Sequence, residues 1–277
     1  MSKSTACTFY DKPKLRECSL IVCWNEDAAR LGPKVINYLN NKLQGKFFCE
    51  IEPEGFFSLG GVLVNNNIAQ FPESKFYYFP DHELIALKSG TPRTEWYKFL
   101  NTIIDIVEQL CPIKELYTIG SMVTFTAHTM PRTLFATVNY SDMKATLSQY
   151  NIATDMNYET PPGQRPTISS YLLWIAKHRN VMGAALWVPV PFYLLPTDDT
   201  KAWRKTTDFF NRKFNLNIDL TDIDEKIHQQ NARLVGLANQ YPELDDLFRK
   251  LENNVNLTDE ENGRLVQLIE ENLRSEL

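Results

Sequence analysis

Short apolar runs and helical periodicities alternate along the first part of the chain. Residues 19–23 are mostly apolar and include β-branched side chains, which is typical of a buried strand. From residue 28 to residue 43 the apolar positions recur at three- and four-residue steps, so they share one face of a helix, and Gly45 stands where a C-cap is expected. Pro33 stands in the middle of this stretch, where it does not suit a straight helix; alternatively, it marks the first turn. The chain thus opens as strand, loop and helix.

The same alternation continues to residue 214. Further strands are predicted at residues 47–51, 62–65, 83–88, 116–119, 134–140 and 183–188, with a hairpin-like pair around residues 76–79. Further helices are predicted at residues 94–110, 167–178 and 202–214. Repeated strand–helix–strand order favours a parallel sheet with helices on both faces. We therefore predict the α/β class, a three-layer α/β/α sandwich with a mostly parallel sheet.

The composition changes at Asp219. From there to the end, the chain is rich in Asn, Glu, Asp, Leu and Gln, and its leucines and isoleucines recur at helical spacing. This segment holds fourteen acidic and six basic residues, a local charge of −8, whereas the preceding residues carry a local charge of +3. We therefore predict two parts, an α/β body over residues 1–218 and an acidic helical C-terminal extension over residues 219–277.

Composition excludes several classes of protein. Hydrophobic residues make up 43% of the 277 residues and charged residues 23%, which is typical of a globular chain with a sizeable core. The longest nearly apolar stretch, residues 184–196, contains three prolines and is shorter than the roughly 20 apolar residues of a membrane-spanning helix. The N-terminal residues lack the apolar centre of a secretory signal. We expect a cytoplasmic protein with no membrane partner.

The charge and cysteine patterns limit the classes of partner and cofactor that we expect. A mildly positive body with an acidic extension provides no basic stripe for a phosphate backbone, so nucleic acid is not an expected partner. Five cysteines without C-x-x-C spacing favour reduced, buried thiols over disulfides or a zinc site. The four histidines are far apart, and the sequence contains neither a glycine-rich phosphate loop nor a G-x-S-x-G motif. We therefore expect no cofactor and no metal. These patterns identify no catalytic residue.

The loop after the first predicted strand contains Trp24, Asn25, Glu26 and Asp27. It lies at the carboxyl end of a strand, where ligands of open α/β sheets bind. Its two carboxylates fit acid–base chemistry or the binding of a cation. Alternatively, Asp27 is the N-cap of the next helix and Glu26 interacts favourably with the helix dipole. The sequence leaves both interpretations open.

A second polar loop, residues 126–132, follows the strand predicted to end near Ile119. We therefore expect it at the same edge of the sheet as the first loop. Here His128 is a candidate base and Arg132 a candidate clamp for an anion. The alternative is a hydrogen-bonded pair with a structural role.

Two later segments complete the candidate surface. Tyr158 and Gly163 lie in a proline-containing loop that is suited to the rim of a pocket, to a partner surface or to a simple connecting turn. Residues 187–193 leave a strand through two prolines and end at Tyr193, which either closes the same sheet edge or packs against the extension. The candidate pocket or partner surface comprises Trp24, Asn25, Asp27, His128, Arg132, Tyr158, Gly163 and Tyr193.

Taken in order, these four segments resemble motifs of the proteasome assembly chaperone 2 family. The family's G-W-N-D-A-like loop corresponds to residues 23–28, Cys-Trp-Asn-Glu-Asp-Ala, and its P-H-T-R-P-like loop to residues 127–132, Ala-His-Thr-Met-Pro-Arg. Its Y-x-x-P-x-G loop corresponds to residues 158–163, and its W-x-x-V-P-x-Y strand end to residues 187–193. The resemblance covers about residues 15–215, and the order and spacing of the motifs make it specific.

The resemblance implies an α/β/α sandwich similar to phosphorylase-like folds, a helical C-terminal extension and self-association into small homo-oligomers. For eukaryotic and archaeal relatives it also implies a chaperone-like role on proteasome α subunits. Glu26 and Met130 depart from the family motifs and alter any shared pocket at two points. Some archaeal relatives dock through a hydrophobic–tyrosine–any terminus, which residues 274–277, Arg-Ser-Glu-Leu, do not match.

Two functions follow as hypotheses. The first is a non-catalytic, cytoplasmic, assembly-chaperone-like protein that binds copies of itself and proteasome α subunits. The second is a small-molecule-binding enzyme of the phosphorylase or hydrolase kind, with a pocket at the carboxyl edge of the sheet. Only the second requires a set of side chains to converge on one cavity, namely Asn25, Asp27, His128, Arg132 and Tyr158.

Overall fold

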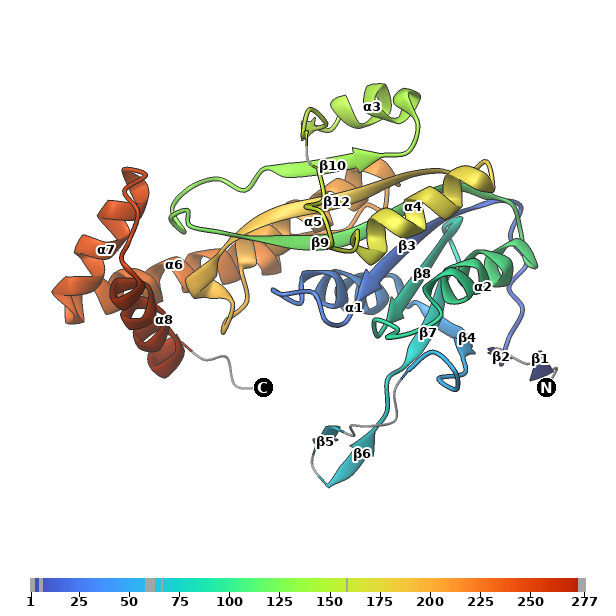
Figure 1. Ribbon diagram of the computed structural model, residues 1–277, viewed down its shortest axis with the longest axis horizontal. Helices are drawn as coiled ribbons and strands as arrows, with labels where there is room; N and C mark the ends of the chain where they lie inside the picture. The colour runs from blue at the N-terminus through green and yellow to red at the C-terminus, as the bar shows by residue number, and fades with distance from the viewer. Residues whose placement is uncertain (1–2, 5–6, 58–62, 66, 158, 274–277) are drawn as a thin grey trace. The chain divides into compact units, whose positions relative to one another are not determined.

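A computed structural model describes residues 3–4, 7–57, 63–65, 67–157 and 159–273 (Figure 1). The chain forms two compact units. The first unit comprises the described residues up to Glu26 together with Gly32–Gly120 and Phe135–Leu186. The second unit comprises Asp27–Leu31, Ser121–Leu134 and the described residues from Trp187 onward. The boundary proposed at residue 219 stays a prediction.

Ten strands form the main sheet. In spatial order they are β1 (Lys3–Ser4), β2 (Cys7–Phe9), β4 (Lys46–Ile51), β7 (Ser74–Phe79), β8 (Leu84–Ser89), β3 (Cys18–Trp24), β9 (Ile113–Thr124), β12 (Met182–Pro191), β10 (Leu134–Val138) and β11 (Ile152–Ala153). β3 pairs in parallel with both of its neighbours, so that Leu20 lies opposite Ile85 of β8 and Leu116 of β9. Antiparallel pairs connect β8, β7, β4, β2 and β1. The sheet is therefore parallel around β3, and the short turn between β7 and β8 reverses the chain direction on one side.

Helices cover both faces of the sheet in the first unit. They are α1 (Leu31–Leu43), α2 (Trp96–Glu108) and α4 (Ile168–His178). Successive side chains of a strand point to opposite faces. In β3, Cys23 lies against Gly32 of α1, whereas Trp24 donates a hydrogen bond to Ser169 of α4, and α2 lies beside α4 (Figure 1). The predicted α/β/α sandwich is confirmed.

The close approach of α1 to the sheet depends on glycine. A β-carbon placed on Gly32 would lie only 2.5 Å from the β-carbon of Cys23, so a larger residue would push the helix away. Pro33 lies in the first turn of α1, because the helix begins at Leu31 and not at residue 28, where the apolar pattern starts. On the other face, Thr167 accepts a hydrogen bond from the Ser170 N–H and thereby caps α4.

Several elements differ from the sequence-based expectation. β9 and β12 are longer than predicted, and β1, β2, β11 and α3 (Ser141–Ser148) were not expected. α3 buries only Met143 and Leu147, which is too sparse a pattern to predict a helix. The run expected at residues 62–65 contains β5 (Leu63–Asn65), which pairs with β6 (Ile68–Gln70) in a separate two-stranded sheet. Residue 62 lies outside the described residues.

The helices of the second unit form a core of their own. After the 3-10 turn η1 (Phe192–Leu194) come α5 (Thr200–Lys213), α6 (Thr221–Gln240), α7 (Pro242–Glu252) and α8 (Asp259–Leu273). Leucines spaced along α6, α7 and α8, among them Leu237, Leu244 and Leu268, are buried together. The predicted helical extension is confirmed. Three acidic residues occupy the first turn of α8, where they interact favourably with the helix dipole.

All five cysteines are buried, and none forms a disulfide. Burial raises the pKa of the Cys18 and Cys49 thiols, so both stay protonated at neutral pH. None of the helices in the described part of the chain has the length and apolar character that a membrane crossing requires.

Candidate functional site

The first candidate loop is held within the first unit. The Trp24 indole is 5% exposed, and its Nε1–H donates a hydrogen bond to Ser169 Oγ at 3.0 Å. The Asn25 backbone N–H donates to the Ser89 carbonyl oxygen at 2.8 Å. Glu26 Oε2 accepts a bond of 2.7 Å from a backbone N–H just after β8. Trp24 is therefore a packing residue, and Glu26 connects the loop after β3 to the loop after β8.

The carboxylate of Asp27 accepts hydrogen bonds from other residues of the second unit. Its Oδ2 accepts a hydrogen bond from the Leu31 N–H at 3.0 Å, at the first residue of α1. Its Oδ1 accepts from both the N–H and the hydroxyl of Ser121 in β9, at 2.7 and 2.9 Å. Ser121 Oγ in turn accepts from the Ala29 N–H at 3.1 Å. Asp27 is not the N-cap residue itself, because α1 begins at Leu31, but its carboxylate binds the first N–H of the helix and both of its oxygens are engaged in hydrogen bonds.

His128 and Tyr193 form a buried pair. The Tyr193 hydroxyl oxygen accepts a hydrogen bond from the His128 backbone N–H at 2.6 Å and lies 2.9 Å from His128 Nδ1. The His128 ring packs edge-on against Phe248 of α7, with ring centroids 4.6 Å apart. The Tyr193 proton needs an acceptor, and Nδ1 is the one within reach, so we assign the Nε2-protonated tautomer to His128.

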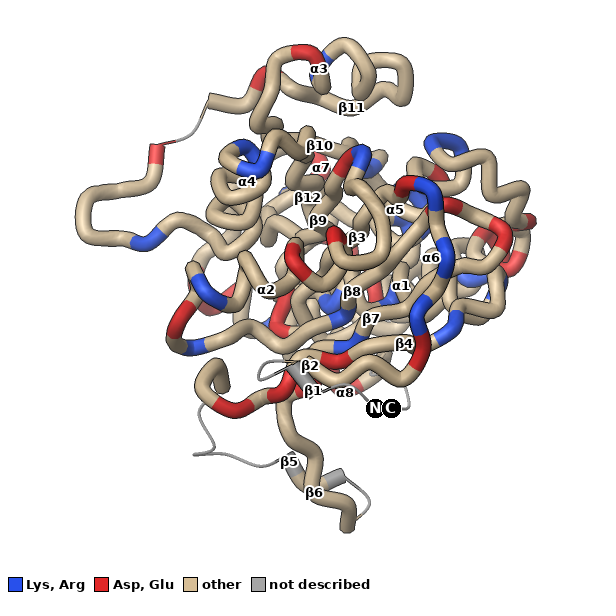
Figure 2. Tube along the Cα trace, turned by 90° about the vertical axis from the view of Figure 1, so that its right-hand side faces the viewer, with Lys and Arg blue, Asp and Glu red and all other residues tan. Residues whose placement is uncertain are grey.

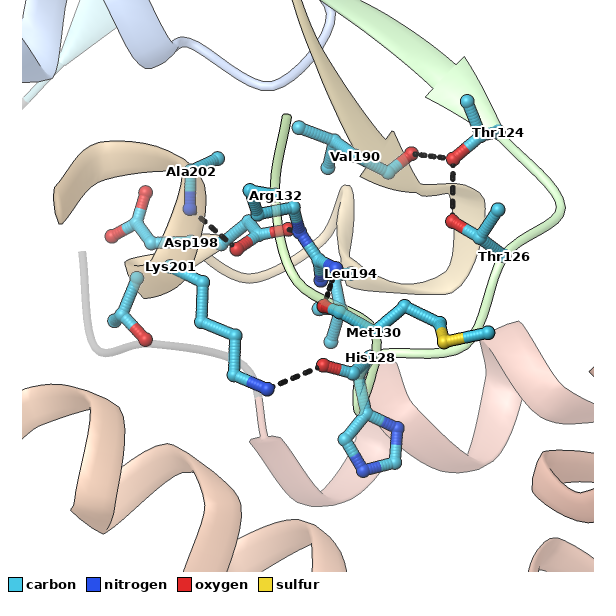
Figure 3. Close-up of polar contacts among 12 residues, drawn as sticks. Thr124, Thr126, His128, Met130, Arg132, Val190, Leu194, Asp198, Lys201 and Ala202 are labelled. Atoms are coloured by element: carbon cyan, nitrogen blue, oxygen red, sulfur yellow. Dashed lines mark hydrogen bonds and ion pairs between the residues drawn. The ribbon is translucent and has the colours of Figure 1, made fainter. Parts of the chain in front are cut away.

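Burial keeps the His128 imidazole neutral. Desolvation, followed by the nearby charges of Lys201 and Arg132, lowers the pKa of His128 to about 4. Lys201 Nζ donates a hydrogen bond to the His128 carbonyl oxygen at 2.7 Å (Figure 3). Desolvation also lowers the pKa of Lys201. A neutral imidazole whose Nδ1 accepts from Tyr193 is poorly placed to serve as a general base.

Arg132 is paired with Asp199 in the interior of the second unit. Its Nε donates to Asp199 Oδ2 at 2.7 Å, and the two side chains are 3% and 2% exposed. Its Nη1 donates to the Met130 carbonyl oxygen at 2.7 Å (Figure 3). Asp199 Oδ1 also accepts from the Ala202 N–H at 2.9 Å and so caps α5. The pair connects the loop of residues 126–132 to the start of α5.

A basic cavity of about 340 Å³ lies beside this ion pair, within the second unit. Its lining residues are Pro131, Arg132, Lys201, Arg204, Lys205, Asp208 and Ile227. Arg204 is paired with Asp208 and Asp224, whereas Lys201 Nζ contacts carbonyl oxygens. Arg132 Nη2 is buried without a hydrogen-bond partner among the described residues. Its lining holds four cations and one acid, and Asp199 and Asp224 pair with two of the cations, so the remaining excess of positive charge suits a small anion.

The C-terminal helices hold the second and fourth candidate segments. Tyr193 is fully buried in the same apolar cluster as Ala127 and the leucines of α6, α7 and α8. The Tyr193 ring lies 5.6 Å from that of Phe248. Thr129 Oγ1 donates to Glu252 Oε1 at 2.7 Å. Tyr193 therefore packs against the extension, which was one of its two possible roles.

The structure brings together only part of the predicted set. His128, Arg132 and Tyr193 are neighbours in the second unit, and the cavity described above is lined by Arg132 alone among the eight predicted residues. Gly163 adopts φ of 82° in an exposed turn of the first unit, a conformation that glycine tolerates. Tyr158 lies outside the described residues. Within those residues, no three His, Cys, Asp or Glu side chains are placed to hold a metal ion.

Sequence reasoning missed the partners of the predicted residues. Ser121, Asp199, Lys201 and Phe248 complete the bonds of Asp27, Arg132 and His128. Asp199 precedes a predicted helix, so its capping role has a local signal. Its pairing with Arg132, 67 residues away, has none.

Comparison with known proteins assigns the chain to a family. The model of the PAC2 family matches residues 25–238, which is most of the chain. The chain belongs to the PAC2 family. This confirms the resemblance inferred from the four motifs. A search of curated proteins finds no match for this PAC2 family member.

Solved structures share the fold of this PAC2 family member at low sequence identity. A Corynebacterium glutamicum protein of unknown function is 15% identical and has a TM-score of 0.75, with 91% of this chain and 97% of that chain covered. Pyrococcus furiosus PbaB, an archaeal proteasome activator, is 20% identical with a TM-score of 0.65, covering 83% and 97%. The Mycobacterium tuberculosis proteasome-assembly chaperone homologue Rv2125 is 14% identical with a TM-score of 0.68, covering 83% and 99%.

Proposed function

We propose that this PAC2 family member is a non-catalytic, cytoplasmic protein that acts as an assembly chaperone, binding copies of itself and proteasome α subunits. Family membership supports the proposal, and so does the fold shared with a proteasome activator and a proteasome-assembly chaperone homologue. Partner binding by such a protein takes place at its surface, so it needs no open reaction site.

This proposal rests mainly on one observation: the candidate catalytic groups are engaged in hydrogen bonds and an ion pair within the protein. Both oxygens of Asp27 accept hydrogen bonds, His128 is buried and held by Tyr193, and Arg132 is paired with Asp199. A general base must reach the proton of a substrate and have a pKa near the working pH. His128 is 7% exposed, and its pKa is lowered to about 4. These groups support the loops that would present a binding surface.

The test is capture of proteasome α subunits by the tagged full-length protein. The bait is incubated with a native lysate that contains assembling proteasomes, cross-linked, and analysed by mass spectrometry. The control is an unrelated acidic protein with the same tag. We expect α subunits to be enriched over the control, with cross-links to surface residues of the bait. Equal recovery of α subunits with both baits would refute the proteasome part of the proposal.

A second candidate function, the binding of a small anion, is favoured by the basic cavity beside Arg132. Lys201 and Lys205 line this cavity together with Arg132, and Lys201 is bonded to carbonyl oxygens. A small phosphorylated or carboxylated molecule would supply the missing negative charge. Titration with inorganic phosphate, followed by calorimetry, tests this function. Binding that is weakened by Lys205→Met but unaffected by Lys144→Met would support it, and absence of binding would exclude phosphate.

A further inference from the structure

A projecting two-stranded ribbon of the first unit exposes apolar side chains. We name its described residues, 63–65 and 67–72, the apolar arm. Among the described residues, β5 and β6 pair only with each other, and they lie outside the main sheet (Figure 1). Val64 is 64% exposed, Ile68 65% and Phe71 51%. No charged residue occurs in the sequence between Glu54 and Glu73, and the described part of the arm carries no charge colour in Figure 2.

An arm of this kind is poorly suited to remain uncovered in water. An isolated two-stranded hairpin is marginally stable at best, because it has no third strand or helix against which to bury a face. Its outer edges also present unpaired backbone groups, which are a template for pairing with another strand. Soluble proteins commonly protect such edges with charged residues, and this arm has none. The composition of the arm therefore indicates a contact surface.

A second exposed apolar surface lies on α2 and α4 of the same unit. We name it the aromatic face, and it consists of Trp96 and Tyr97 of α2 with Tyr171 and Trp174 of α4. Trp174 is 5.4 Å from Tyr171 and 6.4 Å from Tyr97 between ring centroids, and Trp96 is 6.4 Å from Tyr171. Tyr97 is 59% exposed and Trp174 47%. Tryptophan and tyrosine are the residues most enriched at the energetic centres of protein interfaces.

The residues that precede the arm in the sequence contact the start of α2. The Arg93 N–H, just before α2, donates to the Phe56 carbonyl oxygen at 3.1 Å. Thr94 Oγ1 donates to the Gly55 carbonyl oxygen at 3.3 Å. The Phe56 ring packs on Phe99 of α2, with ring centroids 5.0 Å apart. These contacts fix Gly55 and Phe56, which precede the arm in the sequence, to the end of α2 that carries Trp96 and Tyr97.

We propose that the apolar arm and the aromatic face form the contact with a second copy of this chain. The proposal rests on the self-association in the proposed function and names its surface. In a twofold dimer the same surface is contributed by both subunits, so it must be complementary to itself. The uncharged arm meets that condition, because it brings no like charges together. A standard interface buries about 800 Å² on each partner, more than the three exposed apolar side chains of the arm supply, so both surfaces are needed.

Sedimentation of the full-length protein with three matched substitutions tests this surface. Val64→Glu changes the arm and Trp174→Glu changes the aromatic face. Val235→Glu is the control, because Val235 is 58% exposed on α6 of the second unit. A glutamate at a twofold contact places like charges together, so each of the first two variants should raise the dimer dissociation constant on the order of a hundredfold or more. The control should leave it unchanged, and circular dichroism should show that all three variants fold.

Each other outcome overturns the proposal. If only Val64→Glu weakens the dimer, the aromatic face is not part of the contact, and if only Trp174→Glu does, the arm is not. If Val235→Glu weakens it equally, the surface is wrongly assigned. Wild-type protein that stays monomeric at every concentration refutes both this surface and the proposed self-association. Capture of proteasome α subunits by the Val64→Glu variant is measured in parallel, so loss of the dimer and loss of the chaperone role are distinguished.

A cysteine substitution provides a second test that does not depend on destabilising the dimer. The native cysteines are all buried, so Ile68→Cys adds an exposed thiol on the arm. Arms that meet at a twofold axis should form a disulfide-linked dimer on mild oxidation, whereas Val235→Cys should stay monomeric in a denaturing gel. Equal cross-linking of the two variants would refute contact between the arms.

Discussion

Replacing His128 with asparagine should remove an acid-induced loss of stability. In the unfolded chain a histidine titrates near pH 6.5, but burial beside Lys201 and Arg132 lowers the folded-state pKa of His128 to about 4. Between these values the unfolded state binds the proton and the folded state does not. Stability is therefore fully present above about pH 6.5 and is lost as the pH falls toward the folded-state pKa. From about pH 7.5 to about pH 5, this linkage costs the folded protein about 2 kcal/mol.

The assay compares free energies of unfolding by urea across this pH range. Asparagine keeps an oxygen that can accept the Tyr193 hydrogen bond, but it does not titrate. His128→Asn should therefore lose about 2 kcal/mol less than the wild type between about pH 7.5 and about pH 5, whatever its stability at neutral pH. His228→Asn, at an exposed position of α6, is the control and should follow the wild type. Parallel profiles for wild type and His128→Asn would refute the burial argument.

Three further predictions concern the same network, each measured as a free energy of unfolding. Asp27→Ala should cost about 2 kcal/mol, because it removes the bond to the first N–H of α1 and the bonds to β9; a loss no larger than that of Asp155→Ala, an exposed position, would contradict this role of the carboxylate. Tyr193→Phe should cost about 1–3 kcal/mol by leaving His128 groups without a partner, and an unchanged midpoint would argue against the pair. Arg132→Met should cost about 3–5 kcal/mol, because it leaves the buried Asp199 carboxylate without its cation. Adding Asp199→Asn to this variant should restore part of the lost stability. If the effects of the two substitutions on stability are strictly additive, the two side chains are not coupled.

Much of the fold could be predicted from local patterns. Helical spacing of apolar residues identifies α2 and α4, because each buries one face against the sheet. Thr167 is a threonine directly before such a pattern and caps α4 as its side chain allows. The helical extension follows from the leucine spacing after Asp219. Such signals extend over only a few residues, so they can be recognised in the sequence without the tertiary structure.

The motifs in the sequence also indicate the PAC2 family. Their residues do not reveal whether the motifs serve chemistry or packing. The same Asp27 is compatible with a catalytic acid and with a helix cap, and the bonds to Leu31 and Ser121 are what distinguish them. Likewise, Tyr193 is compatible with a pocket rim until its burial among the C-terminal leucines is known.

Tertiary structure alone decided the partners and the charge states of the candidate site. Arg132 contacts Asp199 and His128 contacts Phe248 because folding brings the loop of residues 126–132 against the start of α5 and against α7. The low pKa of His128 likewise results from desolvation that only folding imposes. Local patterns in the sequence predict most of the strands and helices, but not β1, β2, β11 or α3, and the motifs indicate the family. Which side chains are buried together depends on chain topology, which no local pattern specifies.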